Sequence, residues 1–274
     1  MKSYFSYPLA FLFALLMITN CSNGQADDDH PGKFLVIRKN YNNSNIDGYN
    51  LYVPKSCNKD SDAFPVIVFL QGGLGVGGDV SKIMNWGLPK MIREVEDLSA
   101  EIDQLRANTF VLIMPHMIGG QFYDHPESIE AILDEVIENY NVDVTRIYLT
   151  GLSRGGYGTW GMANKLSDRF AAIAPIAGGP MGAIDNEKFS KLPIWVAHNP
   201  DDNVVKYRTS KKAVDGIEEF IGTEFHKSNT VAAADFESND RIFTSSRNDA
   251  KPHDAWTEMY NEPNFYKWLL RFKK

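Results

Sequence analysis

The chain has 274 residues, of which 43% are hydrophobic and 23% charged, and its formal net charge at pH 7 is −7. This length suits one substantial domain, and the acidic balance argues against a nucleic-acid partner, because a phosphate-binding face needs clustered Lys and Arg. Only two cysteines, Cys21 and Cys57, are present, which excludes a fold held together by a disulfide framework.

The first 32 residues have the composition of an export signal followed by a tether. A lysine precedes the apolar run Leu9–Ile18, which has the length of a signal-peptide core and falls short of the ~20 residues that span a bilayer. Residues 18–21 (ITNC) resemble a bacterial lipobox, so we expect a signal peptide over 1–21 and lipidation of Cys21. The protein would then be secreted and anchored to the bacterial outer membrane or cell surface, touching a membrane only through its lipid. Ordinary secretion, with Cys21 incidental, is the alternative. The polar, acidic residues 22–32 predict a flexible tether.

The sequence from residue 33 to 274 predicts a single α/β domain, because it contains no repeat, low-complexity tract or second linker. Short apolar runs rich in β-branched and aromatic residues alternate with helical patterns. Several runs are continuously apolar, which is typical of strands buried on both faces, so we expect a mostly parallel sheet with helices on both sides. The expected strands are Phe34–Arg38, Tyr49–Val53, Val66–Leu70, Phe110–Met114, Arg146–Thr150, Ala171–Ile176 and Ile194–Ala197, and the expected helices are Ser81–Leu98, Pro126–Tyr140, Gly156–Leu166, Ser210–Ile221 and Pro263–Phe272.

The segment Arg146–Gly156 (RIYLTGLSRGG) has the pattern of a strand, a sharp turn and a helix. Its centre, Gly151-Leu152-Ser153-Arg154-Gly155, is a G-x-S-x-G motif in the context that a nucleophile elbow requires. The glycines two residues to either side remove side chains that would collide with neighbouring backbone in a strained turn. A structural turn with a capping serine is the alternative. The pattern favours Ser153 as a catalytic nucleophile.

A serine nucleophile needs a base, and the base needs a carboxylate to orient it. In sheets of this type the acid follows a later strand, and the loop after residue 197 contains both Asp201 and Asp202, between which the chemistry does not choose. Only His226 and His253 follow the acid. His253 is favoured because it lies in a polar loop just before the last predicted helix. His198, at the strand end, is interpreted as structural.

Five segments together resemble one group of bacterial α/β-hydrolases. The group includes esterase-D-like carboxylesterases, feruloyl and acetylxylan esterases, polyhydroxybutyrate-depolymerase-like enzymes and predicted secreted peptidases. In its H-G-x-x-D-x-x-V pattern the acid matches Asp202, and its His-x-x-Trp-Thr pattern matches His253 and Trp256. The resemblance therefore implies an α/β-hydrolase fold with Ser153, Asp202 and His253 as the triad. The segments, in the group's order, are Tyr49–Pro54, Val66–Gly73, Arg146–Trp160, Trp195–Val205 and His253–Leu270.

Acyl transfer also needs two donors for the oxyanion. We expect them to be the backbone N–H groups of Arg154, directly after the nucleophile, and of Gly73, in the glycine-rich loop 71–78. That loop lacks the Lys-Ser/Thr pair of a phosphate-binding loop. Gln71 stands where relatives of the resembled group usually have histidine. The Arg154 side chain is expected to pair with a nearby carboxylate rather than with an acidic substrate group.

The substrate is less constrained than the reaction. Trp160 is expected to pack in the core. The leading interpretation is a carboxylesterase acting on a small-molecule or polysaccharide ester, plausibly an acetyl or feruloyl ester. A peptidase acting on short peptides and a catalytically silent surface binding protein are the alternatives. The sequence contains no metal cluster, nucleotide motif or cofactor site, so we expect the protein to need no cofactor. Residues that we expect to line the pocket are Gln71, His116, Gln121, Phe122, Tyr123 and Trp256.

Overall fold

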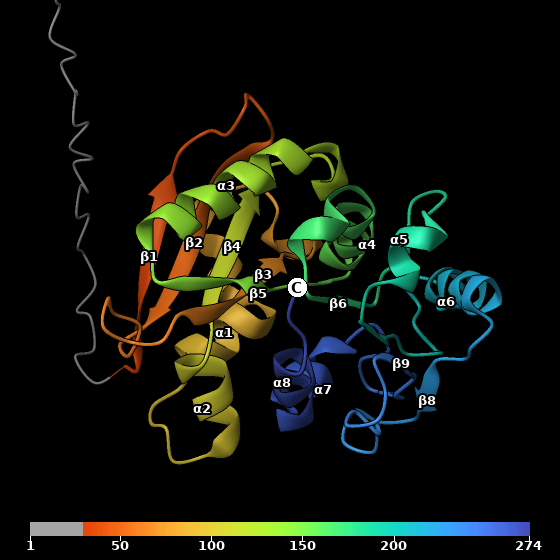
Figure 1. The fold of residues 1–274 in the computed structure, drawn as a ribbon. Coiled ribbons are helices and arrows are strands. Elements are labelled where there is room, and N and C mark those ends of the chain that lie inside the picture. Colours follow the sequence, from red (N-terminus) through yellow and green to blue (C-terminus); the bar gives the residue numbers. More distant parts are fainter. Residues whose placement is uncertain (1–29) are drawn as a thin grey trace, which may run out of the picture.

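The computed structural model describes residues 30–274, and these form a nine-stranded sheet with helices on both faces (Figure 1). The strands are β1 (Gly32–Arg38), β2 (Ile46–Pro54), β3 (Phe64–Leu70), β4 (Val111–Met117), β5 (Val142–Leu152), β6 (Ala172–Ile176), β7 (Ile194–Ala197), β8 (His226–Ser228) and β9 (Arg241–Thr244). Their order in the sheet is β1-β2-β4-β3-β5-β6-β7-β9-β8. β2 runs antiparallel to β1 and β4, and all the other neighbouring pairs are parallel. The expected mostly parallel sheet is confirmed.

The central strands bury side chains on both faces of the sheet. In β3, Val66, Val68 and Leu70 belong to one hydrophobic cluster, whereas Ile67 and Phe69 belong to a second. Successive residues of a strand point to opposite faces, so a continuously apolar strand needs a cover on each side. This is why the apolar runs of the sequence do not alternate with polar residues.

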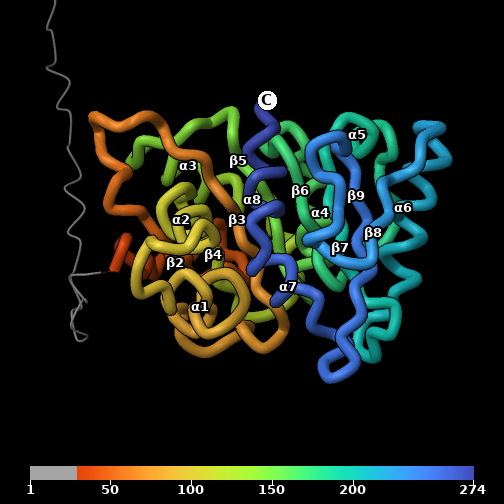
Figure 2. The backbone as a smooth tube through the Cα atoms, turned by 90° about the horizontal axis from the view of Figure 1, so that it is seen from below, coloured from red at the N-terminus to blue at the C-terminus, as the bar shows by residue number. Residues whose placement is uncertain are grey.

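Two sets of helices supply these covers. The first hydrophobic cluster includes side chains of α3 (Pro126–Asn139), α4 (Arg154–Leu166), α5 (Asn186–Ser190) and α6 (Arg208–Ile221). The second includes side chains of α1 (Gly87–Arg93), α2 (Glu101–Asn108), α7 (Trp256–Asn261) and α8 (Pro263–Leu270). Figure 2 views the molecule from the side of the second set, and α1, α2, α7 and α8 lie in front of the sheet. Short 3-10 helices are η1 (Gly73–Gly75), η2 (Val80–Asn85), η3 (Phe122–Asp124) and η4 (Ser167–Arg169).

The helix expected at Ser81–Leu98 is broken in the structure. η2 ends at Asn85, Trp86 is extended, and α1 begins at Gly87. Gly87 has a φ of +56°, and a Cβ at this position would lie 2.7 Å from Leu152 Cδ2 and 3.0 Å from Phe69 Cζ. The chain passes so close to the sheet here that only glycine fits. The segment therefore forms a turn at Trp86–Gly87 instead of the continuous helix that its periodicity predicts.

Most of the α-helices and strands that the sequence did not predict lie in the C-terminal third, and the other one is α2 (Glu101–Asn108). β8 and β9 are three and four residues long, and α5 and α7 are five and six residues long. Such short elements do not complete enough periods to be distinguished from loops. The sheet nevertheless includes β9 and β8, because β9 pairs with β7 in parallel register, from Ile194 opposite Arg241 to Ala197 opposite Thr244.

The predicted signal peptide, Cys21 and residues 22–29 of the predicted tether lie outside the described residues. The end of the predicted tether is packed against the domain, because the His30 ring contacts the Gly32 carbonyl at 2.9 Å and the Ile92 carbonyl at 3.0 Å. Within residues 30–274, no helix has the length and apolarity needed to cross a membrane.

Candidate active site

Ser153 sits in the turn that joins β5 to α4, at one end of the central strand. Its backbone has φ 54° and ψ −114°, a conformation that L-residues rarely adopt and that the surrounding structure must enforce. Two backbone hydrogen bonds hold the turn, from Ser153 N to the Ile176 carbonyl at 2.9 Å and from Tyr157 N to the Ser153 carbonyl at 3.1 Å. The strand therefore delivers the serine into a strained turn, as the sequence pattern predicts.

Three glycines around the turn are required by close backbone contact. A Cβ at Gly155 would lie 1.9 Å from the Leu70 carbonyl oxygen, and a Cβ at Gly156 would lie 2.3 Å from the Ile176 carbonyl oxygen. At Gly151 a Cβ would approach the Gly155 carbonyl oxygen to 2.5 Å. No side chain fits at these distances, so the glycines of the G-x-S-x-G motif let the turn pack against the neighbouring strands.

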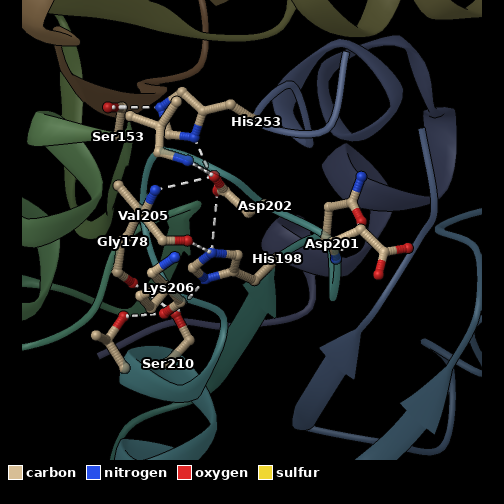
Figure 3. A network of polar contacts seen from close by, with 12 residues as sticks. Ser153, Gly178, His198, Asp201, Asp202, Val205, Lys206, Ser210 and His253 are labelled. Atoms are coloured by element: carbon tan, nitrogen blue, oxygen red, sulfur yellow. Dashed lines mark hydrogen bonds and ion pairs between the residues drawn. The ribbon is translucent and has the colours of Figure 1, made fainter. Parts of the chain in front are cut away.

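His253 reaches the serine from the loop between β9 and α7. Its Nε2 lies 2.9 Å from Ser153 Oγ, which is hydrogen-bond distance (Figure 3). The His253 ring also packs edge-on against Trp256, with ring centroids 5.2 Å apart, and its side chain is 20% exposed. The imidazole is thus fixed in orientation while its outer edge remains open to solvent.

Asp202 faces the other nitrogen of His253 from the loop after β7. Its Oδ2 lies 2.7 Å from His253 Nδ1, and its Oδ1 accepts the backbone N–H groups of Val204 at 2.8 Å and Val205 at 2.9 Å. Burial by itself would raise the pKa of this carboxyl. Hydrogen bonds from His198, His253, Val205 and Val204 outweigh burial and lower the pKa of Asp202 to about 2, so the group is ionised at neutral pH.

The alternatives that the sequence left open lie elsewhere. Asp201 points away from the site, is exposed, and pairs with Arg247 at 3.1 Å (Figure 3). His226 belongs to β8, at the edge of the sheet, and its Nε2 accepts the backbone N–H of Asp235 at 3.1 Å. Of the residues considered, the structure brings together Ser153, His253 and Asp202.

The loop after β3 runs beside the nucleophile turn. A Cβ at Gly72 would lie 2.5 Å from Leu152 Cδ1, so this loop packs on the residue that precedes Ser153. Neither the N–H of Gly73 nor that of Arg154 has a backbone or side-chain acceptor within residues 30–274. Arg154 is also the first residue of α4, where the helix dipole favours negative charge. Both groups are free to donate, and their role as oxyanion donors stays a prediction.

Several residues that we expected to line a pocket are buried instead. Gln71 is 1% exposed, lies under Gly75 and donates from Nε2 to the Met117 carbonyl at 3.1 Å, so it supports the loop from below. Phe122 is fully buried in the first hydrophobic cluster. His116 is also fully buried, with Nδ1 at 2.5 Å from Asp47 Oδ1. These three side chains make contacts within the protein: Gln71 with the end of β4, Phe122 with the hydrophobic core, and His116 of β4 with Asp47 of β2.

Tyr123 and Trp160 lie along α4. The backbone of Gly161 packs against the Tyr123 ring, and the Tyr123 side chain lines a small cavity of about 120 Å³ beside α4. Trp160 is fully buried and donates from Nε1 to the Gly178 carbonyl at 3.0 Å, which confirms its predicted place in the core. Gln121 precedes η3 and is half-buried.

The side chain of Arg154 makes a contact that the sequence did not predict. Its Nη1 donates to the Gly120 carbonyl at 2.6 Å, in the loop between β4 and η3. No carboxylate of the described residues forms an ion pair with it, so the expected carboxylate partner is wrong. The guanidinium links the start of α4 to that loop through a neutral acceptor.

A cleft of about 720 Å³ lies between α1 and α7, and His253 lines part of it. Besides His253, two tryptophans line it: Trp256, which was expected, and Trp86, which was not and which is 44% exposed. Lys251 also faces this cleft. The polar part of its wall includes the amide side chains of Asn85, Asn203 and Asn261. The charged residues Lys90, Glu94, Arg106 and Asp254 line it as well. Because the sequence predicted a helix through residue 86, Trp86 was not considered a candidate, although a Trp-Gly pair that interrupts a helical pattern is a signal of a turn.

Comparison with known proteins agrees with this fold. No family model matches the chain. One curated relative is a bifunctional acetylxylan esterase/xylanase from Neocallimastix patriciarum, 30% identical over 99 residues, which is 36% of this chain and 14% of that protein. Another is a poly(3-hydroxyalkanoate) depolymerase C from Paucimonas lemoignei, 47% identical over 53 residues, or 19% of this chain and 13% of that protein. The matched segments are thus a small part of either relative.

Solved structures match over most of the chain. A thermostable esterase superposes with a TM-score of 0.66 at 24% identity, covering 90% of this chain and 64% of that one. A feruloyl esterase module from Clostridium thermocellum, complexed with sinapinate, superposes with a TM-score of 0.61 at 13% identity, covering 89% of this chain and 88% of that one. At these identities the likeness shows the fold. The protein has the α/β-hydrolase fold, and its resemblance to the esterase and depolymerase group is seen in both sequence and structure.

Proposed function

We propose that the protein is a serine hydrolase that cleaves carboxylic esters through an acyl-enzyme, with Ser153 as nucleophile, His253 as base and Asp202 as the orienting acid. The observation that carries the proposal is the continuous hydrogen-bonded chain from Ser153 Oγ through His253 to the ionised Asp202, set on a strained turn. Backbone strain of this kind is costly and is retained where it positions reacting groups.

The mechanism follows from the positions of these groups. His253 Nε2 accepts the proton of Ser153 Oγ as that oxygen attacks the ester carbonyl, and Asp202 stabilises the imidazolium that forms. The oxyanion accepts hydrogen bonds from the backbone N–H groups of Gly73 and Arg154. His253 then donates the proton to the departing alcohol, and water repeats the sequence on the acyl-enzyme to release the acid and restore Ser153.

The cleft beside His253 suits the alcohol part of the substrate. Because His253 Nε2 must protonate the leaving oxygen, the alcohol passes next to this ring, and the cleft begins there. Tryptophan rings with amide groups nearby bind large, hydroxyl-rich molecules by stacking and hydrogen bonding. Together with the acetylxylan and feruloyl esterase names of the similar proteins, this supports acetyl or feruloyl esters of a polysaccharide as substrates.

A fluorophosphonate probe tests the proposed chemistry directly. The purified protein is incubated with the probe, the labelled residue is located by peptide mass spectrometry, and wild type is compared with Ser153→Ala and His253→Ala. We expect labelling at Ser153 in wild type, none in Ser153→Ala, and at least a 100-fold slower reaction in His253→Ala. Hydrolysis of p-nitrophenyl acetate should fall about 10⁶-fold in Ser153→Ala. An unlabelled, inactive wild type would favour a surface binding protein, and activity on short peptides alone would favour a peptidase.

We also propose that residues 1–21 direct export and that Cys21 carries a lipid anchor, with the domain carried on the tether that follows. The support is the sequence pattern around Cys21. Cys21→Ser should release the full-length protein from the membrane fraction of a bacterial host, and globomycin should block maturation of the wild type. Membrane retention of the Cys21→Ser protein would contradict lipidation.

A further inference from the structure

A second histidine contacts the acid of the proposed triad. His198 is the first residue after β7, and its side chain is fully buried. Its Nε2 lies 3.1 Å from Asp202 Oδ2, the same oxygen that faces His253 (Figure 3). The loop between β7 and α6 therefore presents one carboxylate oxygen to two imidazole rings.

The partners of His198 determine where its proton lies. Nε2 faces Asp202 Oδ2 and, at 3.0 Å, the Val205 carbonyl oxygen, and both of these atoms can only accept a hydrogen bond while Asp202 is ionised. The nitrogen between them must therefore carry the hydrogen. His198 is a hydrogen-bond donor to Asp202, whatever the state of its other nitrogen.

The ring of His198 is held from its opposite side as well. Nδ1 lies 2.7 Å from Ser210 Oγ in α6, and that hydroxyl lies 2.8 Å from the Gly178 carbonyl. The edge of Tyr207 packs against the ring, with centroids 5.7 Å apart. With contacts at both nitrogens and on one face, His198 has a single orientation, and its N–H points at Asp202.

Asp202 consequently receives four donors. Its Oδ1 accepts two backbone N–H groups, and its Oδ2 accepts one N–H from each histidine. A carboxylate held in this way cannot rotate, and the negative charge of Oδ2 is shared between two rings. Asp202 therefore attracts a protonated His253 less strongly than it would if His253 were the only ring in contact with Oδ2.

We propose that His198 is a positioning residue for the reaction proposed above, which fixes the Asp202 carboxylate for His253 and limits how tightly the His253 imidazolium is held. A tightly held imidazolium would accept the Ser153 proton readily but return it to the departing alcohol slowly. Sharing Oδ2 with His198 balances the two transfers, because it limits how strongly Asp202 attracts the proton carried by His253.

The titratable and charged groups near this pair are few. Asp202 and Tyr207 face His198 from the β7–α6 loop, and His253 faces Asp202 from the β9–α7 loop. From α4, the Tyr157 hydroxyl interacts electrostatically with Asp202. Arg247 and Asp201 form an exposed pair at the rim. Among these groups, only His198 and His253 donate a side-chain N–H to Asp202.

Substitution of His198 by leucine and by glutamine tests the proposal. Leucine fills the space without a donor, and glutamine places an amide N–H close to the position of Nε2. For p-nitrophenyl acetate we expect His198→Leu to lower kcat about 10- to 100-fold with KM changed less than about threefold. The acid limb of its pH–rate profile should move to higher pH, because Asp202 then holds the His253 proton more tightly. His198→Gln should recover most of kcat and the wild-type profile.

Two further variants separate positioning from a general loss of structure. Ser210→Ala leaves the contact between His198 and Asp202 intact but frees the far side of the ring, and should give a smaller loss of kcat in the same direction. His226→Leu removes a hydrogen-bonded histidine from β8 and should leave the profile unchanged. If His198→Leu does not fold, Ser210→Ala tests the proposal, and an unchanged kcat and pH profile in that variant overturns it.

The outcomes distinguish this inference from the proposed function. An inactive wild type that no fluorophosphonate labels overturns the proposed function and this inference with it. A wild type whose activity depends on Ser153, together with a His198→Leu variant of unchanged kcat and pH profile, overturns this inference alone. A fall in kcat without any movement of the acid limb, not recovered by glutamine, also overturns it, since that is the result of a structural role only.

Discussion

The proposed nucleophile and its proposed acid–base partners come from two regions of the molecule whose geometry is encoded differently. The turn at Ser153 is built from residues adjacent in sequence, with β5 before it, α4 after it and glycines that prevent collisions. His253 and Asp202 lie 51 residues apart in the sequence, and His253 lies 100 residues from Ser153. They meet only because β7 pairs with β9. Substitutions of the glycines in the first region should therefore act through the backbone, and substitutions of Asp202 or His253 in the second through the proposed chemistry.

The largest contrast is expected between the two neighbouring aspartates. Asp202→Asn removes the charge that orients and stabilises His253, and kcat for p-nitrophenyl acetate should fall about 10⁴-fold. Asp201→Asn removes only an exposed pair with Arg247, and kcat should stay within about twofold, because exposed ion pairs contribute little. Steady-state kinetics of the two purified variants measure this contrast. Equal losses would mean that the loop, rather than the carboxylate, matters.

The nucleophile turn should respond to a single methyl group. In Gly155→Ala the new Cβ would meet the Leu70 carbonyl oxygen at 1.9 Å, so the free energy of unfolding should fall by more than about 3 kcal/mol, with activity lost alongside. Gly216→Ala is the matched control, because it lies in α6 with open space around it. There alanine should stabilise by about 0.5–1 kcal/mol. Urea unfolding followed by circular dichroism gives both values, and a stable Gly155→Ala protein would refute the steric account of the motif.

The same contrast explains how far the sequence could be interpreted. The strand-turn-helix context of Ser153 is local, so the position of the candidate nucleophile, the buried strands and the fold class were all predictable. The choice between Asp201 and Asp202 needed family resemblance, because both lie in one short loop and only the tertiary structure turns one of them inward. β9, the strand that precedes the His253 loop, is four residues long and carries no recognisable period.

Pocket residues were harder to predict than the proposed triad, because the tertiary structure decides which side chains face a cavity. Aromatic and amide side chains near strand ends serve equally well as core and as lining. Phe122 and Gln71 became core, whereas Trp86 lines the cleft because the positive φ of Gly87 turns the chain before α1. The sequence predicts only a structural role for His198, because its Nε2 reaches the oxygen that also contacts His253 only in the folded structure.

Acid should weaken the second region more than the first. The pKa of Asp202 is about 2 in the folded protein, against about 3.9 in an unfolded chain. A group with a lowered pKa contributes stability that is present above its unfolded value and is lost as the pH falls through the folded value. The stability gap between wild type and Asp202→Asn should therefore narrow by about 2 kcal/mol from pH 4 to pH 2. Urea titrations at four pH values measure it, and a gap that does not vary with pH would show that the folded carboxyl has an ordinary pKa.

The smallest effect is expected from the cleft and concerns selectivity between substrates. Trp86 is 44% exposed and lines the same cleft as His253 and Trp256. If the alcohol of the substrate stacks there, Trp86→Ala should raise KM about 10-fold for an acetylated xylo-oligosaccharide, the equivalent of one aromatic contact of about 1.4 kcal/mol. Turnover of p-nitrophenyl acetate, whose alcohol is too small to extend along the cleft, should stay within about twofold. Phe220→Ala removes another exposed aromatic side chain, on α6, and serves as the control.

A Trp86→Ala variant that loses activity equally on both esters would indicate that Trp86 acts in folding. A variant that binds the oligosaccharide as well as wild type does would mean that the alcohol leaves by another path, and the search for the substrate would then move to the Arg154 side of the site.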